Sequence, residues 1–206
     1  LTISIIGLGY VGLPLSLLFA KNDIRTIGLD IDQKKIDSLI KGKSYIKHIN
    51  SNSIKKYVDR NSFIPSSNLK LVNESDAIIL CLPTPLNKFR EPNLSYIKNT
   101  LNNIKDYLKK GQLISLESTS YPGTTEDLFI PFIKEKGFNL GEDFFVTYSP
   151  EREDPGNNIY PVEKIPKVVG GLSKNCHNLG INLYKLVFEK VHSVSSTKVA
   201  EMTKLL

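Results

Sequence analysis

Residues 3–20 read ISIIGLGYVGLPLSLLFA: an apolar run, a loop with three glycines, and a second apolar run of helical length. The first run suits a buried strand and the second suits a helix. Each glycine between them has its own purpose. Gly7 permits a tight turn, Gly9 lets the backbone approach a pyrophosphate, and Gly12 lets the helix pack closely on the strand. The pattern predicts a strand–loop–helix unit whose helix N-terminus offers N–H groups and partial positive charge to phosphates.

An acidic residue closes the next predicted strand, which covers residues 25–30. Asp30 stands eighteen residues beyond Gly12, close to the ~20-residue spacing at which a carboxylate meets the ribose of a dinucleotide. A carboxylate there accepts hydrogen bonds from both ribose hydroxyls and repels a 2′-phosphate. We therefore expect the chain to bind NAD in preference to NADP. The alternative is a unit of the same architecture that binds no nucleotide.

Composition and charge argue against several other classes of protein. Of the 206 residues, 40% are hydrophobic and 23% are charged, which is ordinary for a globular protein. No apolar run approaches the length of a membrane span and no leader pattern precedes the first strand, so we expect a cytoplasmic protein without a membrane partner. The net charge of +6 comes from lysines spread without interleaved aromatic residues, which argues against nucleic acid. The two cysteines and three histidines lack metal-ligand spacing, so we expect no metal.

Strand and helix patterns alternate along the chain. This alternation predicts an α/β fold, a Rossmann-like, doubly wound, mostly parallel sheet with helices on both faces. The predicted strands cover residues 2–6, 25–30, 69–72, 76–82, 112–116, 143–148, 166–170 and 190–194. The predicted helices cover residues 11–21, 33–41, 51–60, 94–108, 124–136 and 174–187, and another begins near Ser196.

Two segments depart from this alternation. The stretch 42–67 is polar and too long for an ordinary loop, and we expect it to carry the short helix 51–60 at the edge of a cleft. Residues 198–206 have helical spacing but no C-cap, so we expect the chain to be a fragment. We accordingly divide it into an NAD-binding domain at 1–195 and the start of a linking helix at 196–206, with the substrate domain outside the chain.

Three polar loops follow predicted strands of the sheet: PTPL at 83–86, ESTSYPGTT at 117–125, and SPEREDPG at 149–156. Ligands of open parallel sheets bind beyond the carboxyl ends of the strands. Ordinary turn chemistry would explain any one of these loops. The three together, beside the glycine loop, predict a cleft with the dinucleotide at its floor.

In these motifs the sequence resembles the family of UDP-glucose, UDP-N-acetylhexosamine and GDP-mannose dehydrogenases, which oxidise C6 of a nucleotide sugar. The resemblance spans the chain through GLGYVGLPL at 7–15, PTP at 83–85, ESTSYPGTT at 117–125, SPER at 149–152 with PG at 155–156, KVVGG at 167–171, and EMTKLL at 201–206. GKSYIKHI at 42–49 resembles the UDP-N-acetyl-D-glucosamine 6-dehydrogenase branch, which serves O-antigen or capsule synthesis. Pro155 stands where the glucose branch typically carries a glutamate, so UDP-glucose 6-dehydrogenase is the less favoured alternative.

The resemblance implies roles for individual residues. The implied cofactor contacts are Gly7, Gly9, Tyr10, Val11, Gly12, Asp30, Lys35, Pro83, Thr84, Ser118 and Thr119. The implied catalytic residues are Glu151, which handles protons or positions water, Lys204, which stabilises a developing oxyanion, and Thr119, which lines the reacting carbon. A partly desolvated glutamate can serve as general base and a fixed ammonium favours an alkoxide. Taken without the resemblance, a surface ion pair for Glu151 and a solvated helix face for Lys204 are the simpler interpretations.

The family's reaction is a four-electron oxidation with two NAD, in which a cysteine captures the aldehyde and water hydrolyses the resulting thioester. Neither Cys81 nor Cys176 matches the sequence context of that cysteine, so we expect this chain to bind NAD but not to complete the oxidation alone. The resemblance also implies a UDP-sugar substrate and a homodimer paired through the helix near Ser196. Two alternatives stay open: a catalytically silent NAD-binding sensor module, and a β-hydroxyacid-type dehydrogenase that shares only the first 30 residues.

Overall fold

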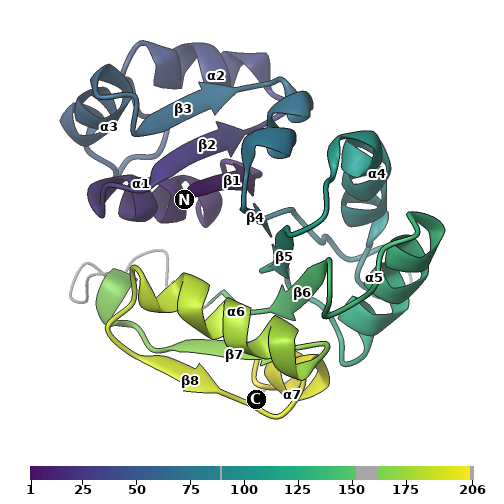
Figure 1. The fold of residues 1–206 in the computed structure, drawn as a ribbon. Helices are drawn as coiled ribbons and strands as arrows, with labels where there is room; N and C mark the ends of the chain where they lie inside the picture. Colours follow the sequence, from purple (N-terminus) through teal and green to yellow (C-terminus); the bar gives the residue numbers. More distant parts are fainter. Residues whose placement is uncertain (89, 152–161, 205–206) are drawn as a thin grey trace.

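The computed structural model describes residues 1–88, 90–151 and 162–204, and a single eight-stranded sheet forms its centre (Figure 1). The strands are β1 (Thr2–Ile6), β2 (Arg25–Leu29), β3 (Phe63–Ser66), β4 (Ala77–Leu80), β5 (Leu113–Leu116), β6 (Phe145–Tyr148), β7 (Lys167–Gly171) and β8 (Val191–Ser193). Their order across the sheet is β3-β2-β1-β4-β5-β6-β7-β8. Neighbouring strands are parallel except β6 and β7, which are antiparallel. The predicted α/β fold with a mostly parallel sheet is confirmed.

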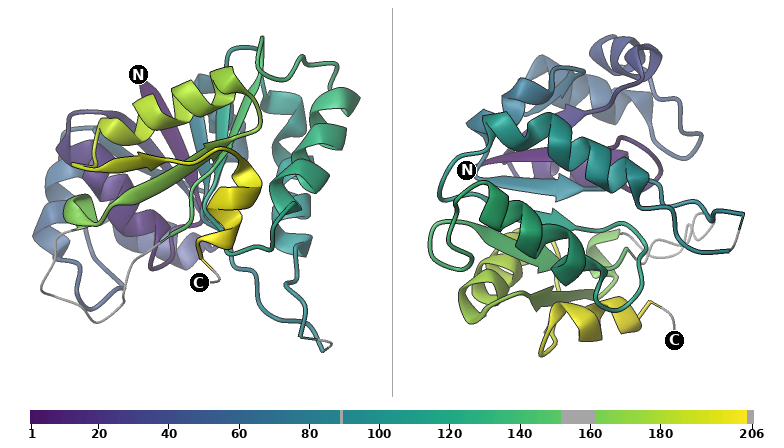
Figure 2. Two further views of the ribbon diagram at one scale, coloured as in Figure 1. Left: turned by 90° about the horizontal axis from the view of Figure 1, so that it is seen from below. Right: turned by 90° about the vertical axis from the view of Figure 1, so that its right-hand side faces the viewer.

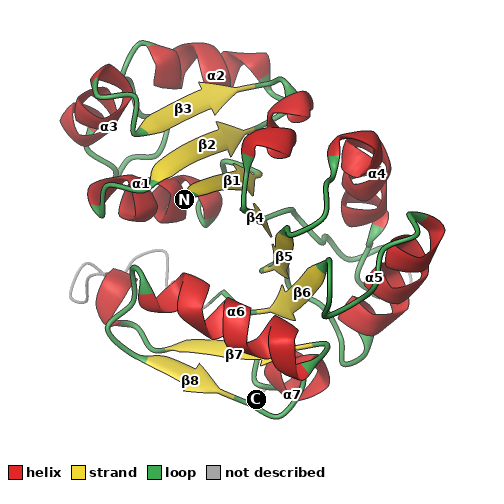
Figure 3. Cartoon of the chain, viewed as in Figure 1, coloured by secondary structure: helices red, strands yellow, loops and turns green. Residues whose placement is uncertain are grey.

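Helices cover both faces of this sheet (Figures 2 and 3). They are α1 (Gly12–Lys21), α2 (Gln33–Ile40), α3 (Ser51–Asp59), α4 (Ser95–Ile104), α5 (Thr124–Glu135), α6 (Lys174–Lys185) and α7 (Thr197–Met202). On one face, α1 and α6 share an apolar cluster that includes Phe19 and Tyr184. On the other, α4, α5 and α7 share a second cluster that includes Leu101, Phe129 and Ala200. Because both faces are covered, central strands such as β4 are buried at every residue.

The chain order of the strands reverses beside β1, because β2 and β3 lie on one side of β1 and β4 lies on the other. Connections to the two sides run over opposite faces of the sheet, so a crevice opens between the carboxyl ends of β1 and β4. The loop after β1 contains the three glycines, and the loop after β4 begins the PTPL motif. The fold therefore brings two of the predicted functional loops to one crevice.

One predicted strand is wrong and another strand was missed. Residues 69–72 belong to a 3₁₀ helix, Leu69–Glu74, which Asn68 caps by accepting from the Lys70 amide at 3.2 Å. The apolar spacing of Leu69 and Val72 fits a three-residue turn, and Val72 is buried. The edge strand β3 lies instead within the polar stretch 42–67. Its Pro65 weakens the strand pattern, and an edge strand tolerates proline.

The remaining predicted elements are present; the strand at residues 2–6 has the predicted bounds, and the others differ by a few residues. The predicted helix 94–108 is α4 followed by a 3₁₀ turn, Lys105–Tyr107. The helix predicted near Ser196 is α7, with the Ser196 side chain accepting from the Val199 amide at 3.2 Å. Within the described parts of the chain, no helix is long and apolar enough to cross a membrane.

Helix α7 is attached to α5 by a buried carboxylate. Glu201 is fully buried, and its side chain accepts hydrogen bonds from the Gly123 amide at 2.6 Å and the Thr125 amide at 2.8 Å. The Thr125 hydroxyl donates a third at 2.7 Å. Gly123 precedes α5 with φ of 100° and has no side chain to cap the helix, so Glu201 supplies the cap from a distant part of the chain.

We expect Glu201→Ala to lower the free energy of unfolding by about 3 kcal/mol or more, because it leaves three buried donors without an acceptor. Denaturant unfolding of the chain measures this loss. Glu126→Ala is the matched control. Glu126 pairs with Lys198 between the same two helices but both side chains are partly exposed, so the loss of this pair should lower stability far less than the loss of Glu201. Equal losses for the two variants would contradict the capping role of Glu201.

Candidate cofactor and active site

A cavity of about 560 Å³ lies at the carboxyl ends of the central strands. Its volume falls within the range typical of cofactor and substrate sites. Its wall is formed by Ile6, Gly7, Gly9, Tyr10, Val11, Asp30, Ile31, Asp32, Lys35, Leu69, Cys81, Leu82, Pro83, Thr84, Tyr96, Thr100, Asn103, Glu117, Ser118, Thr119, Glu151 and Lys204. The glycine loop follows β1 and Asp30 follows β2, whereas Glu151 follows β6 and Lys204 follows α7.

The glycine loop leaves the N-terminus of α1 without a side-chain cap. Val11 holds the N-cap position and makes no side-chain hydrogen bond, and the first turn of α1 contains no acidic residue. The first N–H groups of a helix have no partner inside the helix. A side-chain carbon at Gly9 would meet no other heavy atom within 4 Å in the described parts of the chain, so the space above this residue is open. This loop can therefore receive an anionic group against its backbone.

Asp30 connects the glycine loop to the end of β2. Its carboxylate accepts from the Leu8 amide at 2.9 Å and from the Asp32 amide at 2.9 Å, and it pairs with Lys35 at 3.0 Å. The side chain is only 8% exposed, and it reaches the cavity wall. Two backbone donors and one ammonium hold the carboxylate in place, which suits recognition of a hydroxyl pair on a sugar.

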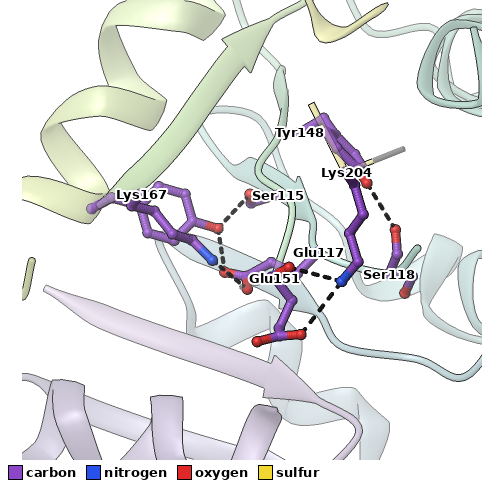
Figure 4. Close-up of polar contacts among 8 residues, drawn as sticks. Ser115, Glu117, Ser118, Tyr148, Glu151, Lys167 and Lys204 are labelled. Atoms are coloured by element: carbon purple, nitrogen blue, oxygen red, sulfur yellow. Dashed lines mark hydrogen bonds and ion pairs between the residues drawn. The ribbon is translucent and has the colours of Figure 1, made fainter. Parts of the chain in front are cut away.

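Glu151 and Lys204, which both line the cavity, contact one another, as Figure 4 shows. Lys204 follows α7, and its Nζ donates to the backbone oxygen of Glu151 at 2.7 Å and lies 3.4 Å from the carboxylate. Burial raises the pKa of the Glu151 carboxyl, and the ammonium groups of Lys204 and Lys167 oppose this rise. The arrangement combines a carboxyl of raised proton affinity with a fixed positive charge.

Ser118 fixes the loops after β4 and β5 to one another. Its hydroxyl accepts from the Leu82 amide at 3.0 Å, and its carbonyl accepts from the Tyr148 hydroxyl at 3.3 Å. Thr119 follows and is exposed, with its side chain on the cavity wall. These bonds place Pro83 and Thr84 on the same wall as Thr119. The two polar loops, joined through Ser118, therefore contribute neighbouring parts of the cavity wall.

A third ion pair, beside this surface, was not expected from the sequence. The Lys167 ammonium lies 2.7 Å from the Glu117 carboxylate, and both side chains are almost fully buried. The Tyr184 hydroxyl also donates to Glu117, at 2.7 Å, and lies 2.7 Å from the Ser115 hydroxyl. Both partners belong to motifs that the sequence singles out, ESTSYPGTT and KVVGG. A lysine that opens an otherwise apolar strand is the signal that could have indicated this pair.

The cavity contains nearly all of the predicted site residues. Gly12 is the exception: it lies against the Gly7 carbonyl and the Cys81 side chain, where a larger residue would collide with backbone. Sequence reasoning missed three side chains that α4 contributes, Tyr96, Thr100 and Asn103.

Several parts of the predicted motifs cannot be placed. Arg152, Pro155 and Gly156 of the SPER and PG motifs, and the last two residues of EMTKLL, lie outside the described residues. Among the described residues, no group of histidine, cysteine, aspartate or glutamate side chains is arranged to hold a metal ion.

The fold and this cavity define a dinucleotide-binding domain of the dehydrogenase type. An uncapped helix behind a glycine loop, an acid at the end of β2, and open space at Gly9 fit the diphosphate and ribose of NAD. The chain belongs to the UDP-glucose/GDP-mannose dehydrogenase family, and residues 1–188 match the NAD binding domain of that family.

Comparisons with individual dehydrogenases show the same relationship. A UDP-N-acetyl-D-mannosamine dehydrogenase of Campylobacter jejuni is 35% identical over 98% of this chain and 51% of its own length. A UDP-N-acetyl-D-glucosamine 6-dehydrogenase of Pseudomonas aeruginosa is 35% identical over 100% of this chain and 48% of its own length. The native structure of the UDP-N-acetyl-mannosamine dehydrogenase Cap5O from Staphylococcus aureus superposes with a TM-score of 0.92 at 32% identity, covering all of this chain and 50% of that one. The chain thus spans about half the length of the relatives it matches.

Proposed function

We propose that this chain is the NAD-binding half of a dehydrogenase that oxidises C6 of a UDP-N-acetylhexosamine to the uronic acid with two NAD. The observation that carries the proposal is the lining of the cavity, which includes the glycine loop and Asp30 as well as Glu151 and Lys204. A domain that only sensed NAD would need the first pair of features and not the second. The names of the two relatives at 35% identity support an N-acetylhexosamine as the sugar.

In this proposal the residues around the cavity have distinct roles. The amides at the start of α1 bind the diphosphate, and Asp30 binds the adenosine ribose with Lys35 beside it. Bound NAD supplies the hydride acceptor for each of the two oxidations. Lys204 stabilises negative charge on the substrate oxygen, and Glu151 accepts a proton from the reacting alcohol or from water, for which its raised pKa is suited. Thr84, Ser118 and Thr119 form the wall beside the reacting carbon.

A panel of UDP-sugars tests the proposed substrate. The complete polypeptide that carries this chain is incubated with NAD and each sugar, and NADH formation is followed. We expect UDP-N-acetylglucosamine to be oxidised best, with two NADH formed for each uronic acid, and UDP-glucose to be oxidised poorly. A complete polypeptide that binds NAD but oxidises none of these sugars would favour the silent sensor module.

We also propose how the chain divides into domains, how the protein assembles and in which compartment it acts. We place the NAD-binding domain at 1–195 and the start of a linking helix at 196–206, and we expect a cytoplasmic homodimer that serves surface polysaccharide synthesis. Val199 and Met202 on α7 are 42% and 45% exposed, which supports pairing through this helix. Light scattering of the complete polypeptide tests the assembly, and a monomer would contradict it.

Replacing Asp30 tests the proposed preference for NAD. We expect Asp30→Asn to weaken NAD binding about tenfold, because the ribose loses a charged acceptor, and to narrow the difference between NAD and NADP, because the 2′-phosphate is no longer repelled. Calorimetry with both dinucleotides measures the two effects. Asp37→Asn on the exposed side of α2 is the control and should change neither affinity. An unchanged ratio of affinities in Asp30→Asn would refute the role of this residue.

A further inference from the structure

The ion pair between Glu117 and Lys167 is held in a closed polar cluster. One oxygen of Glu117 accepts from Lys167 and the other accepts from Tyr184, each at 2.7 Å. Burial raises the pKa of the Tyr184 phenol, so this group stays protonated as a donor. The ammonium of Lys167 also lies over the rings of Tyr184 and Phe188, at 5.1 Å and 5.5 Å from their centroids. We call Glu117 and Lys167, held in this way, the buried pair.

The antiparallel strand β7 explains why the buried pair lies at the cavity. Residue 117 follows β5 and residue 151 follows β6, so both lie at the carboxyl edge of the sheet. A parallel β7 would begin at the opposite edge. Because β7 runs antiparallel to β6, its first residue, Lys167, lies at the carboxyl edge too. The reversal of one strand therefore brings an ammonium group to the back of the site.

Stability alone is a weak explanation for this arrangement. Desolvating two charges offsets most of their attraction, and apolar side chains of similar volume often stabilise a core equally well. The ion pair between Lys110 and Asp143, by contrast, has an exposed ammonium group and needs less desolvation. The buried pair instead adjoins the cavity, since Glu117 forms part of its wall together with Glu151.

We propose that Glu117 and Lys167 form a positioning pair for Glu151, acting through their charges on the Glu151 carboxyl from the cavity wall that Glu117 and Glu151 share. Figure 4 shows the three side chains gathered at one place, with Lys204 on the far side of Glu151. Neither member of the pair needs to touch the substrate. This inference rests on the proposed function in one respect: the buried pair adjusts the proton affinity of a general base only if Glu151 has that role.

Within the described residues, three charged groups from three elements act on Glu151. Burial raises its pKa most. Lys204, after α7, and Lys167, in β7, lower it, and Glu117, after β5, raises it again. Because the pair carries opposite charges, removing one member should shift the titration of Glu151 in one direction and removing the other should shift it in the opposite direction. A pair that served only to hold the fold would not produce opposite shifts.

The test follows the Glu151 carboxyl in the 206-residue chain by NMR with carbon-labelled glutamate, and Glu151→Gln identifies the signal. We expect Lys167→Met to move the titration midpoint upward by about 1 pH unit, and Glu117→Gln to move it downward by a smaller amount. The double variant Glu117→Gln/Lys167→Met should fall between the two single variants. Lys167→Arg, which restores the charge, should return the midpoint toward that of the original chain.

Matched controls separate this effect from a general loss of structure. Lys110 and Asp143 precede β5 and β6, so they lie at the opposite edge of the same two strands. Lys110→Met and Asp143→Asn should leave the Glu151 midpoint unchanged. If Lys167→Met does not fold, Glu117→Gln, Lys167→Arg and the uncharged double variant still measure the direction of each effect.

The outcomes distinguish this inference from the proposed function. Shifts in the same direction for both single variants, or shifts no larger than those of the controls, would overturn the inference whatever the enzyme's activity. Opposite shifts support it, and the acid limb of the kcat–pH profile of the complete polypeptide should then move with them. Opposite shifts without any movement of that limb would support the buried pair while contradicting the role of Glu151 as general base.

Discussion

Replacing Gly9 with alanine is expected to weaken NAD binding by about 100-fold or more while changing the free energy of unfolding by less than about 0.5 kcal/mol. The side-chain carbon would meet no other described atom within 4 Å, so the unliganded fold accepts it. It would occupy the space where the diphosphate approaches the backbone at the start of α1. Calorimetry with NAD and denaturant unfolding measure the two quantities separately.

Gly12→Ala provides the contrast. A side-chain carbon at Gly12 would collide with the backbone oxygen of Gly7, and backbone cannot move aside cheaply. We expect this variant to lose both stability and NAD binding, because Gly12 packs α1 against β1 and does not line the cavity. If Gly9→Ala bound NAD normally, the diphosphate would not rest against this loop and the account of the cofactor site would be wrong.

Glu151→Gln and Lys204→Met are each expected to lower the turnover of a UDP-sugar by about 10²- to 10⁴-fold in the complete polypeptide. In the proposed mechanism, the first substitution removes a proton acceptor and the second removes the charge that stabilises the substrate oxyanion. Affinity for NAD should change little in either variant, because both residues lie away from the diphosphate end of the cavity. Steady-state kinetics and calorimetry measure these effects.

The two residues contact one another, so we expect their effects to be non-additive, with the double variant little slower than the slower single variant. Lys198→Met, on the helix that precedes Lys204, is the control, since Lys198 is exposed and pairs with Glu126 outside the cavity. Turnover retained within about twofold in either Glu151→Gln or Lys204→Met would remove the assigned chemistry.

The central part of the fold could be predicted because its signals are local. The strand of residues 2–6, the three glycines and the acid at Asp30 follow from apolar runs, backbone freedom and spacing. The edge strand Phe63–Ser66 could not, because it is short, contains Pro65 and lies within a polar stretch. The antiparallel direction of β7 was equally hidden, since a strand's pattern of side chains does not reveal which way it runs.

The candidate site, like the fold, could be predicted only in part. The glycine loop and each of the polar loops directly follow a predicted strand, so their positions at the carboxyl edge of the sheet could be predicted. The cluster of Ser115, Glu117, Lys167 and Tyr184 draws on β5, β7 and α6, and only the folded chain brings these residues together. The contact between Lys204 and Glu151 also depends on the position of α7, which the buried Glu201 sets through the start of α5.

A crystal structure of this chain with NAD tests the central claim most directly. We predict density for the diphosphate against the amides of Gly9, Tyr10 and Val11 at the start of α1, with the Asp30 carboxylate within hydrogen-bond distance of both hydroxyls of the adenosine ribose. The nicotinamide should then lie toward Ser118 and Thr119. A dinucleotide bound elsewhere, or an Asp30 side chain turned away from the ribose, would contradict the account.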